Sequence, residues 1–161
     1  MSGMSKIVKT ISSIAFPLIM IYGLYVIAHG HLTPGGGFQG GAVVASGCAM
    51  ILVAYGSIWT MGKIREKNLS VLESIGAIGF IIIALFGLVF GAMFFNNFLA
   101  DGGVIFGDHV TSGSTAADFN TGGVLPLMNF AVGLKVIAGL FAIVLVMAYA
   151  TTKTGGGGGK K

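Results

Sequence analysis

Four long apolar segments constrain the fold of this chain more than any other feature of its sequence. They cover roughly residues 7–28, 38–59, 72–95 and 125–150. A helix needs about 20 largely apolar residues to cross the hydrocarbon core of a bilayer, and each segment meets that length. Only helices and closed barrels satisfy their backbone in lipid, and the period-two alternation of barrel strands is absent here. We therefore predict an all-α integral membrane protein with four transmembrane helices. Residues 1–152 would form one domain, and residues 153–161 a flexible Gly/Lys tail.

The composition supports a membrane location and argues against other classes of protein. Hydrophobic residues make up 55% of the chain and charged residues only 9%, whereas soluble domains carry about 25% charged residues. The net charge of +4 does not predict nucleic-acid binding, because the basic residues gather at the ends of the apolar segments. The lone Cys48 can form neither an internal disulfide nor a cysteine-ligated cluster.

The basic residues also predict an orientation. Eight of the nine lie before the first segment, between the second and third, or after the fourth: Lys6, Lys9, Lys63, Arg65, Lys67, Lys153, Lys160 and Lys161. The two opposite connections contain no Lys or Arg, and the longer one, residues 96–124, holds Asp101, Asp108 and Asp118. The positive-inside rule then places both termini in the cytoplasm of a multi-pass protein of the cell (plasma) membrane.

The remaining basic residue, Lys135, lies inside the fourth segment. It is about ten residues from the outer end, or roughly 15 Å deep at 1.5 Å per residue. A lysine at the bilayer centre costs about 2.5–3.5 kcal/mol, so we expect it to face protein or water. Glu73 is expected at the cytoplasmic membrane edge beside Lys67, so a carboxylate partner for Lys135 would come from another protein of the same complex. Lys135 is therefore either part of an ion pathway or one half of a static interface salt bridge.

A glycine-rich turn joins the first two segments, with the sequence HGHLTPGGGFQGG over residues 29–41. Gly35, Gly37 and Gly40 match the G-x-G-x-x-G nucleotide pattern, but that pattern requires a preceding strand, and here an apolar helix precedes it. Pro34 and the glycines instead predict a tight reversal of the chain. His29 and His31 are either titratable groups of an ion pathway or anchors of the helix end. They are two residues apart without a third ligand nearby, so we predict no metal site.

Small residues recur at helical spacing and predict close packing of helices in lipid. One row starts at the turn and repeats every four residues; a pair follows in the third segment, and one glycine lies a turn after Lys135. These residues are Gly37, Gly41, Ala45 and Ala49, then Gly87 and Gly91, then Gly139.

The turn resembles the signature of the MnhB/MrpB family, which supplies a small component of Mrp-type Na⁺/H⁺ antiporters. The residues that carry the resemblance are Gly30, His31, Pro34, Gly35, Gly36, Gly37, Phe38, Gly40 and Gly41. Related subunits occur in the membrane arms of membrane-bound hydrogenases and of ferredoxin-oxidising respiratory complexes. The run NFAVGLKV at residues 129–136 resembles archaeal and anaerobe-type members, whereas ordinary bacterial antiporter subunits lack this lysine.

The resemblance implies a non-redox subunit of a multisubunit complex that translocates Na⁺ or H⁺. It favours the antiporter-like module of a membrane-bound hydrogenase or a related ferredoxin-driven respiratory complex. The alternatives are the MrpB component of a stand-alone Mrp antiporter and a purely structural membrane scaffold. No catalytic residue and no cofactor is expected in this chain. Iron–sulfur clusters or a NiFe centre would belong to partner subunits, and the expected partners are other membrane subunits, lipid, Na⁺ and H⁺, but no nucleic acid.

Overall fold

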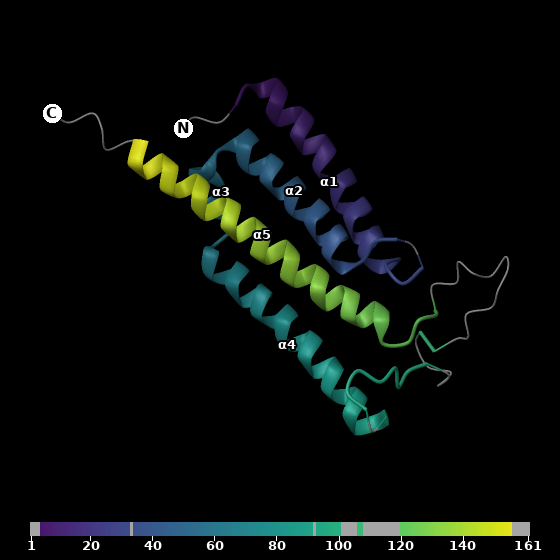
Figure 1. The fold of residues 1–161 in the computed structure, drawn as a ribbon. Coiled ribbons are helices and arrows are strands. Elements are labelled where there is room, and N and C mark those ends of the chain that lie inside the picture. Colours follow the sequence, from purple (N-terminus) through teal and green to yellow (C-terminus); the bar gives the residue numbers. More distant parts are fainter. Residues whose placement is uncertain (1–3, 33, 92, 101–105, 108–119, 156–161) are drawn as a thin grey trace.

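The fold is built from helices that stand side by side (Figure 1). The computed structural model describes residues 4–32, 34–91, 93–100, 106–107 and 120–155. The helices are α1 (Lys6–Ala28), α2 (Gly37–Tyr55), α3 (Ser57–Lys63), α4 (Glu66–Gly91) and α5 (Leu125–Gly155). Among these, α1, α2, α4 and the Leu125–Thr152 part of α5 are long and apolar enough to cross a membrane. The prediction of an all-α protein with four membrane-spanning helices is confirmed.

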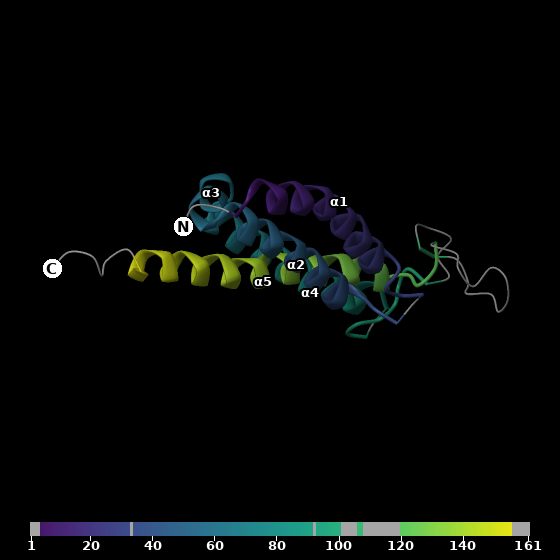
Figure 2. The same ribbon diagram turned by 90° about the horizontal axis from the view of Figure 1, so that it is seen from above.

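The four long helices form a single curved row in the order α1, α2, α5, α4 (Figures 1 and 2). The main contacts join α1 to α2, α2 to α5, and α5 to α4. Residues 4–9, 55–67 and 148–155 gather at one end of the row, here called the terminal end, and the opposite end is called the loop end. A row of this kind leaves both of its broad faces open to lipid or to neighbouring chains.

Apolar packing inside the row is concentrated toward the terminal end. Leu52, Leu69, Phe141 and Leu145 form one buried cluster that joins α2, α4 and α5. Other large apolar side chains, such as Ile7, Ile14, Ile21 and Val89, are exposed on the outside of the helices. Such exposure is unfavourable in water but matches the hydrocarbon of a bilayer.

Helix α1 begins at a serine cap and bends along its length. The side-chain oxygen of Ser5 accepts a hydrogen bond from the Val8 backbone N–H. Pro17 lies inside the helix and lacks the N–H that would continue the backbone ladder. Figure 2 shows the resulting curvature of α1.

The second segment ends earlier than the sequence predicted. Helix α2 stops at Tyr55 because Gly56 adopts φ +92, a left-handed conformation that favours glycine. The chain then turns into the short helix α3, where Trp59 stacks on Tyr55 at 4.5 Å between ring centroids. Ser57 and Thr152 share a hydrogen bond of 3.0 Å between their hydroxyl oxygens, which fastens α3 to the end of α5.

The third segment is displaced relative to the prediction, because α4 starts at Glu66 instead of residue 72 and ends at Gly91 instead of residue 95. Its polar first turns continue the helix beyond the apolar run. After Gly91 the chain turns back, with Phe95 at φ +63, and Asn96 donates a 2.9 Å hydrogen bond to the Gly91 carbonyl. The early start of α4 changes where Glu73 lies.

Helix α5 continues to Gly155, so the first three residues of the predicted tail are helical. The rest of that tail, residues 156–161, lies outside the described residues. The same holds for the three aspartates of the long connection, Asp101, Asp108 and Asp118.

Candidate functional site

The Lys135 side chain lines a groove on one face of the row of helices. The groove has a cavity volume of about 450 Å³ and is lined by residues of three helices, among them Phe38 of α2, Gly76 and Phe80 of α4, and Val132 of α5. The Lys135 side chain is exposed in it, and the other lining side chains named are apolar. An ammonium group in such surroundings requires water or a neighbouring chain to solvate it.

The backbone of α4 passes very close to that of α5 at this groove. A Cβ added to Gly76 would lie 2.7 Å from the Ala131 carbonyl oxygen and 2.8 Å from the backbone nitrogen of Lys135. Only a glycine permits this approach, which fixes the register between the two helices. The level of Gly76 on α4 therefore matches the level of Lys135 on α5.

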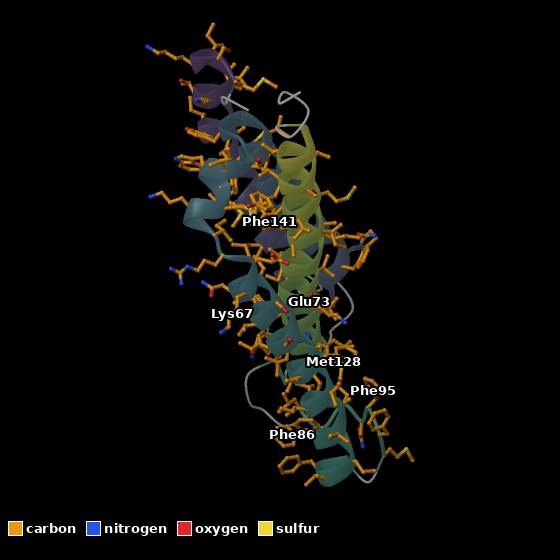
Figure 3. All side chains as sticks on the ribbon, turned by 90° about the vertical axis from the view of Figure 1, so that its left-hand side faces the viewer. Lys67, Glu73, Phe86, Phe95, Met128 and Phe141 are labelled. Atoms are coloured by element: carbon orange, nitrogen blue, oxygen red, sulfur yellow. The ribbon has the colours of Figure 1, made fainter. Side chains whose placement is uncertain are left out.

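Glu73 lies on the side of α4 that packs against α5. A Cβ added to Gly139 would lie 3.4 Å from the Cδ and Oε1 atoms of Glu73, so this carboxyl group rests against α5 one turn from Lys135. Figure 3 shows Glu73 where α4 and α5 lie together. Helix α4 begins at Glu66, so Glu73 is about two turns inside this helix, and its expected position at the membrane edge beside Lys67 stays a prediction.

This position also changes the expectation for Lys135. The sequence predicted no carboxylate of this chain at the depth of Lys135. The structure instead brings Glu73 to the same helix contact, separated from Lys135 by about one turn, or roughly 6 Å along the α5 axis. Gly139, predicted as a helix-packing residue, provides the space for this carboxyl group.

The glycine-rich turn packs against Asn129 near the loop end of α5. A Cβ on Gly30 would lie 2.8 Å from Asn129 Nδ2, and one on Gly36 would lie 3.5 Å from its Oδ1. A Cβ on Gly37 would overlap the Asn129 carbonyl oxygen. The turn therefore packs around a single amide side chain. Pro34 is exposed, and Gly35 is half-buried, with an added Cβ 3.2 Å from Val26 Cγ1 of α1.

The glycines that follow the turn hold α2 between its two neighbours. A Cβ on Gly40 would lie 2.6 Å from the Gly23 carbonyl oxygen of α1, and one on Gly41 would lie 3.0 Å from the Gly133 carbonyl oxygen of α5. Ala45 is buried on the same helix and Ala49 is half-buried. The spacing thus predicted close packing, and α2 packs tightly on both sides.

The two histidines lie where α1 ends. The His29 backbone N–H bonds to the Tyr25 carbonyl at 2.9 Å, and its ring stacks on Tyr25 with centroids 4.4 Å apart. The His31 ring approaches Gly122, whose φ is +93 and whose added Cβ would lie 2.9 Å from His31 Cδ2. Burial, and then the nearby His29, lower the pKa of His31 below its ordinary value, against a raising contribution from the Ala28 backbone. The structure does not bring these histidines to the Lys135 groove, since the residues lining that groove come from α2, α4 and α5.

Gly87 and Gly91 have a different role from the predicted helix–helix contact. A Cβ on Gly87 would lie 2.6 Å from the Asn96 nitrogen, and a Cβ on Gly91 would overlap the Asn96 side chain. Both glycines therefore accommodate the segment that turns back after α4. The aromatic rings of Phe90 and Phe98 stack beside it at 5.3 Å.

Two features of the site were not predicted: the place of Asn129 in the glycine-rich turn, and the packing of Glu73 against α5. Asn129 carries a weak signal, since it is a polar residue near the start of an apolar helix and its position matters only once the turn is folded. Glu73 carried a stronger one, because an acidic residue followed by an apolar run lies inside a helix if the helix begins earlier. Within the described ranges, no group of three or more His, Cys, Asp or Glu residues is placed to hold a metal ion.

Comparisons with known proteins relate this chain to one family. The family model described as a domain related to the MnhB subunit of Na⁺/H⁺ antiporter matches residues 7–142. The solved structure of the membrane-bound sulfane sulfur reductase, an archaeal respiratory membrane complex, contains a chain that superposes with a TM-score of 0.67 at 28% identity, covering 91% of this chain and 61% of that one.

Two curated relatives agree with this relationship. An uncharacterised protein of Methanocaldococcus jannaschii is 35% identical over 146 residues, which are 87% of this chain and 52% of the relative. A Na⁺/H⁺ antiporter subunit of Bacillus subtilis, the B component of its antiporter, is 28% identical over 91 residues, 56% of this chain and 63% of the relative. The chain thus spans between half and two thirds of the length of the proteins it matches.

Proposed function

Because this chain belongs to the MnhB family, we propose that it is a non-redox membrane subunit of a multisubunit complex that translocates Na⁺ or H⁺. Its groove presents Lys135 to a neighbouring chain or to water, and Lys135 takes part in moving the cation. The chain itself contributes no catalysis and holds no cofactor. This proposal rests most on one observation, the ammonium group that opens from a mid-helix position into an apolar groove.

The complex that fits best is a respiratory one, as in a membrane-bound hydrogenase or a related ferredoxin-driven assembly. The likeness to a chain of the sulfane sulfur reductase complex over 91% of this chain supports this assignment. In such an assembly, the iron–sulfur clusters and any NiFe centre belong to partner subunits. The alternative, the MrpB component of a stand-alone Mrp antiporter, is supported by the Bacillus subtilis relative.

The orientation follows from the charges at the two ends of the row. The terminal end carries Lys6, Lys9, Lys63, Arg65 and Lys67, whereas no Lys or Arg occurs in the connections at the loop end. The positive-inside rule supports a cytoplasmic terminal end, and the antiporter-subunit relatives support the plasma membrane as its location. The Lys135 groove then lies closer to the outer side than the Leu52–Leu145 cluster does.

A transport measurement tests the proposed function. The complex is purified through this chain, its subunits are identified by mass spectrometry, and it is reconstituted in liposomes with pH and Na⁺ indicators. Lys135→Met should reduce coupled cation movement at least tenfold while the subunits still co-purify. Lys67→Met, which removes an exposed lysine from the first turn of α4, serves as the matched control and should transport normally.

Three outcomes of the measurement discriminate the alternatives. Co-purified iron–sulfur or nickel subunits support the respiratory assignment, and antiporter subunits alone support the Mrp assignment. Wild-type cation movement by the Lys135→Met complex contradicts a role for Lys135 and supports the scaffold.

A further inference from the structure

Glu73 is a second charged group on the contact between α4 and α5. Its carboxyl group lies within van der Waals distance of where a Gly139 side chain would start, at 3.4 Å, and the residue is half-buried. Glu73 is seven residues after Glu66, the first residue of α4, and so about 10 Å along the helix axis. A charge that interacts with the helix end would lie in the first turn of α4, and Glu73 lies beyond that turn.

The register of the two helices places Glu73 and Lys135 on opposite sides of one close contact. Gly76 packs on the Lys135 backbone, and Glu73 precedes Gly76 by about one turn. Side chains on a helix lean toward its N-terminus. Because α4 and α5 run in opposite directions (Figure 1), Glu73 leans toward the terminal end and Lys135 toward the loop end.

The two groups therefore occupy successive levels along the same seam. Lys135 lies with Ala77, Phe80 and Ile81 in the groove. Glu73 lies about one turn closer to the terminal end, against Gly139. Carboxylates within membrane helices are rare, and those that occur mark ion pathways or proton relays. A static pair would bring the opposite charges together, whereas this seam spreads them over two levels.

We infer that the seam between α4 and α5 is a cation route, in which Glu73 holds the translocated monovalent cation, H⁺ or Na⁺, and the Lys135 ammonium controls its occupancy. This inference rests on the proposed function. A carboxylate attracts the cation, and a nearby ammonium opposes its binding. Movement of Lys135 along the groove then changes how strongly Glu73 retains the ion.

Lys135 is the charged residue on the loop-end side of Glu73 along this seam. On α5, Lys135 is the charged residue nearest to Gly139. The other titratable residues of α3, α4 and α5, and Arg65 between α3 and α4, lie closer to the terminal end: Lys63, Arg65, Glu66, Lys67, Tyr149 and Lys153. Removing the Lys135 ammonium therefore removes the nearest positive charge that α5 brings to this carboxyl group.

A lipid-soluble carbodiimide tests this inference without measuring transport. The protonated carboxyl adds across a C=N bond of dicyclohexylcarbodiimide, its proton passes to the nitrogen, and the product rearranges to a stable N-acylurea. Mass spectrometry of the peptide that contains Glu73 gives the labelling rate in the intact complex in native membranes. Lys135→Met should speed the labelling of Glu73 about tenfold at neutral pH, and Lys6→Met, which removes an exposed lysine at the start of α1, should leave it unchanged.

The identity of the ion follows from the same label. Labelling of wild-type Glu73 that Na⁺ slows and K⁺ does not supports Na⁺ as the bound ion, and labelling that depends on pH alone supports the proton. Equal labelling rates in the wild type and in Lys135→Met overturn the inference, and so does labelling that responds to neither Na⁺ nor pH.

Transport by the same variants separates this inference from the proposed function. Glu73→Gln should lose cation movement at least tenfold, and Glu73→Asp, which keeps the charge in case the glutamine variant does not assemble, should retain part of it. Unchanged transport by Glu73→Gln overturns the cation route, even if Lys135 proves essential. A wild-type complex that moves no cation contradicts the proposed function and the cation route together, even if the labelling rates are coupled.

Discussion

The contact of α5 with α2 and its contact with α4 are both built around glycine, but the chemical groups that lie against these glycines differ. Along α2, Gly37 and Gly41 bring backbone against backbone, with distances near 3 Å from an added Cβ to atoms of Gly133. Along α4, Gly76 does the same once, but the next contact, at Gly139, admits the Glu73 carboxyl group. The first contact brings only backbone against backbone, and the second also places a carboxyl group between the two helices.

The largest effect is expected where backbone meets backbone. Gly40→Ala should destabilise the protein by about 3 kcal/mol, because the added carbon would press on the Gly23 carbonyl and the Ile27 nitrogen, at 2.6 and 2.8 Å. Unfolding in mixed detergent micelles measures the change. Gly62→Ala is the matched control, since nothing lies within 4 Å of its added Cβ, and we expect it to be neutral or slightly stabilising. Equal stability of the two variants would contradict the tight packing of α1 on α2.

The next prediction concerns the contact that holds the carboxyl group. Gly139→Ala should be tolerated, because 3.4 Å is an ordinary contact distance. Gly139→Leu should displace Glu73 and destabilise the protein by about 1–3 kcal/mol, with loss of cation movement. The same unfolding and transport measurements apply. Equal stability and equal cation movement of the alanine and leucine variants would contradict the packing of the Glu73 carboxyl group against Gly139.

How much of this arrangement was predictable depends on the range of the interactions involved. The four long helices follow from local apolar length, and the packing along α2 follows from the spacing of its small residues. The break at Gly56 did not follow, because a glycine inside an apolar run is equally common in a continuous helix. The packing of Glu73 against α5 was not predicted, because residues 66–71, four of which are polar, continue α4 beyond its apolar segment, and only the contact with α5 reveals the register.

A smaller effect is expected at the glycine-rich turn. Asn129→Ala removes the amide enclosed by Gly30 and Gly36 and should cost about 1 kcal/mol. Gln39→Ala, at an exposed position on the first turn of α2, is the control. Unchanged stability of Asn129→Ala in the unfolding measurement would show that the turn does not depend on this amide.

The smallest effect concerns pH. Because the pKa of His31 is lowered in the folded protein from its ordinary value of 6.5, the unfolded chain binds more protons just below that value. The stabilising contribution is complete above pH 6.5 and declines as the pH falls below it. Thermal unfolding between pH 8 and 5 should show this decline in the wild type and not in His31→Gln. His29→Gln should weaken it, because His29 contributes to the lowering.

The single row of helices has a genetic consequence. A partition one helix thick supplies only one side of any aqueous conduit that runs along its groove, and a second polypeptide must supply the other. The functional unit is then split between two genes. Growth selections that restore activity to a defective Lys135 substitution should accordingly recover compensating changes in a neighbouring polypeptide, at the positions that face this groove.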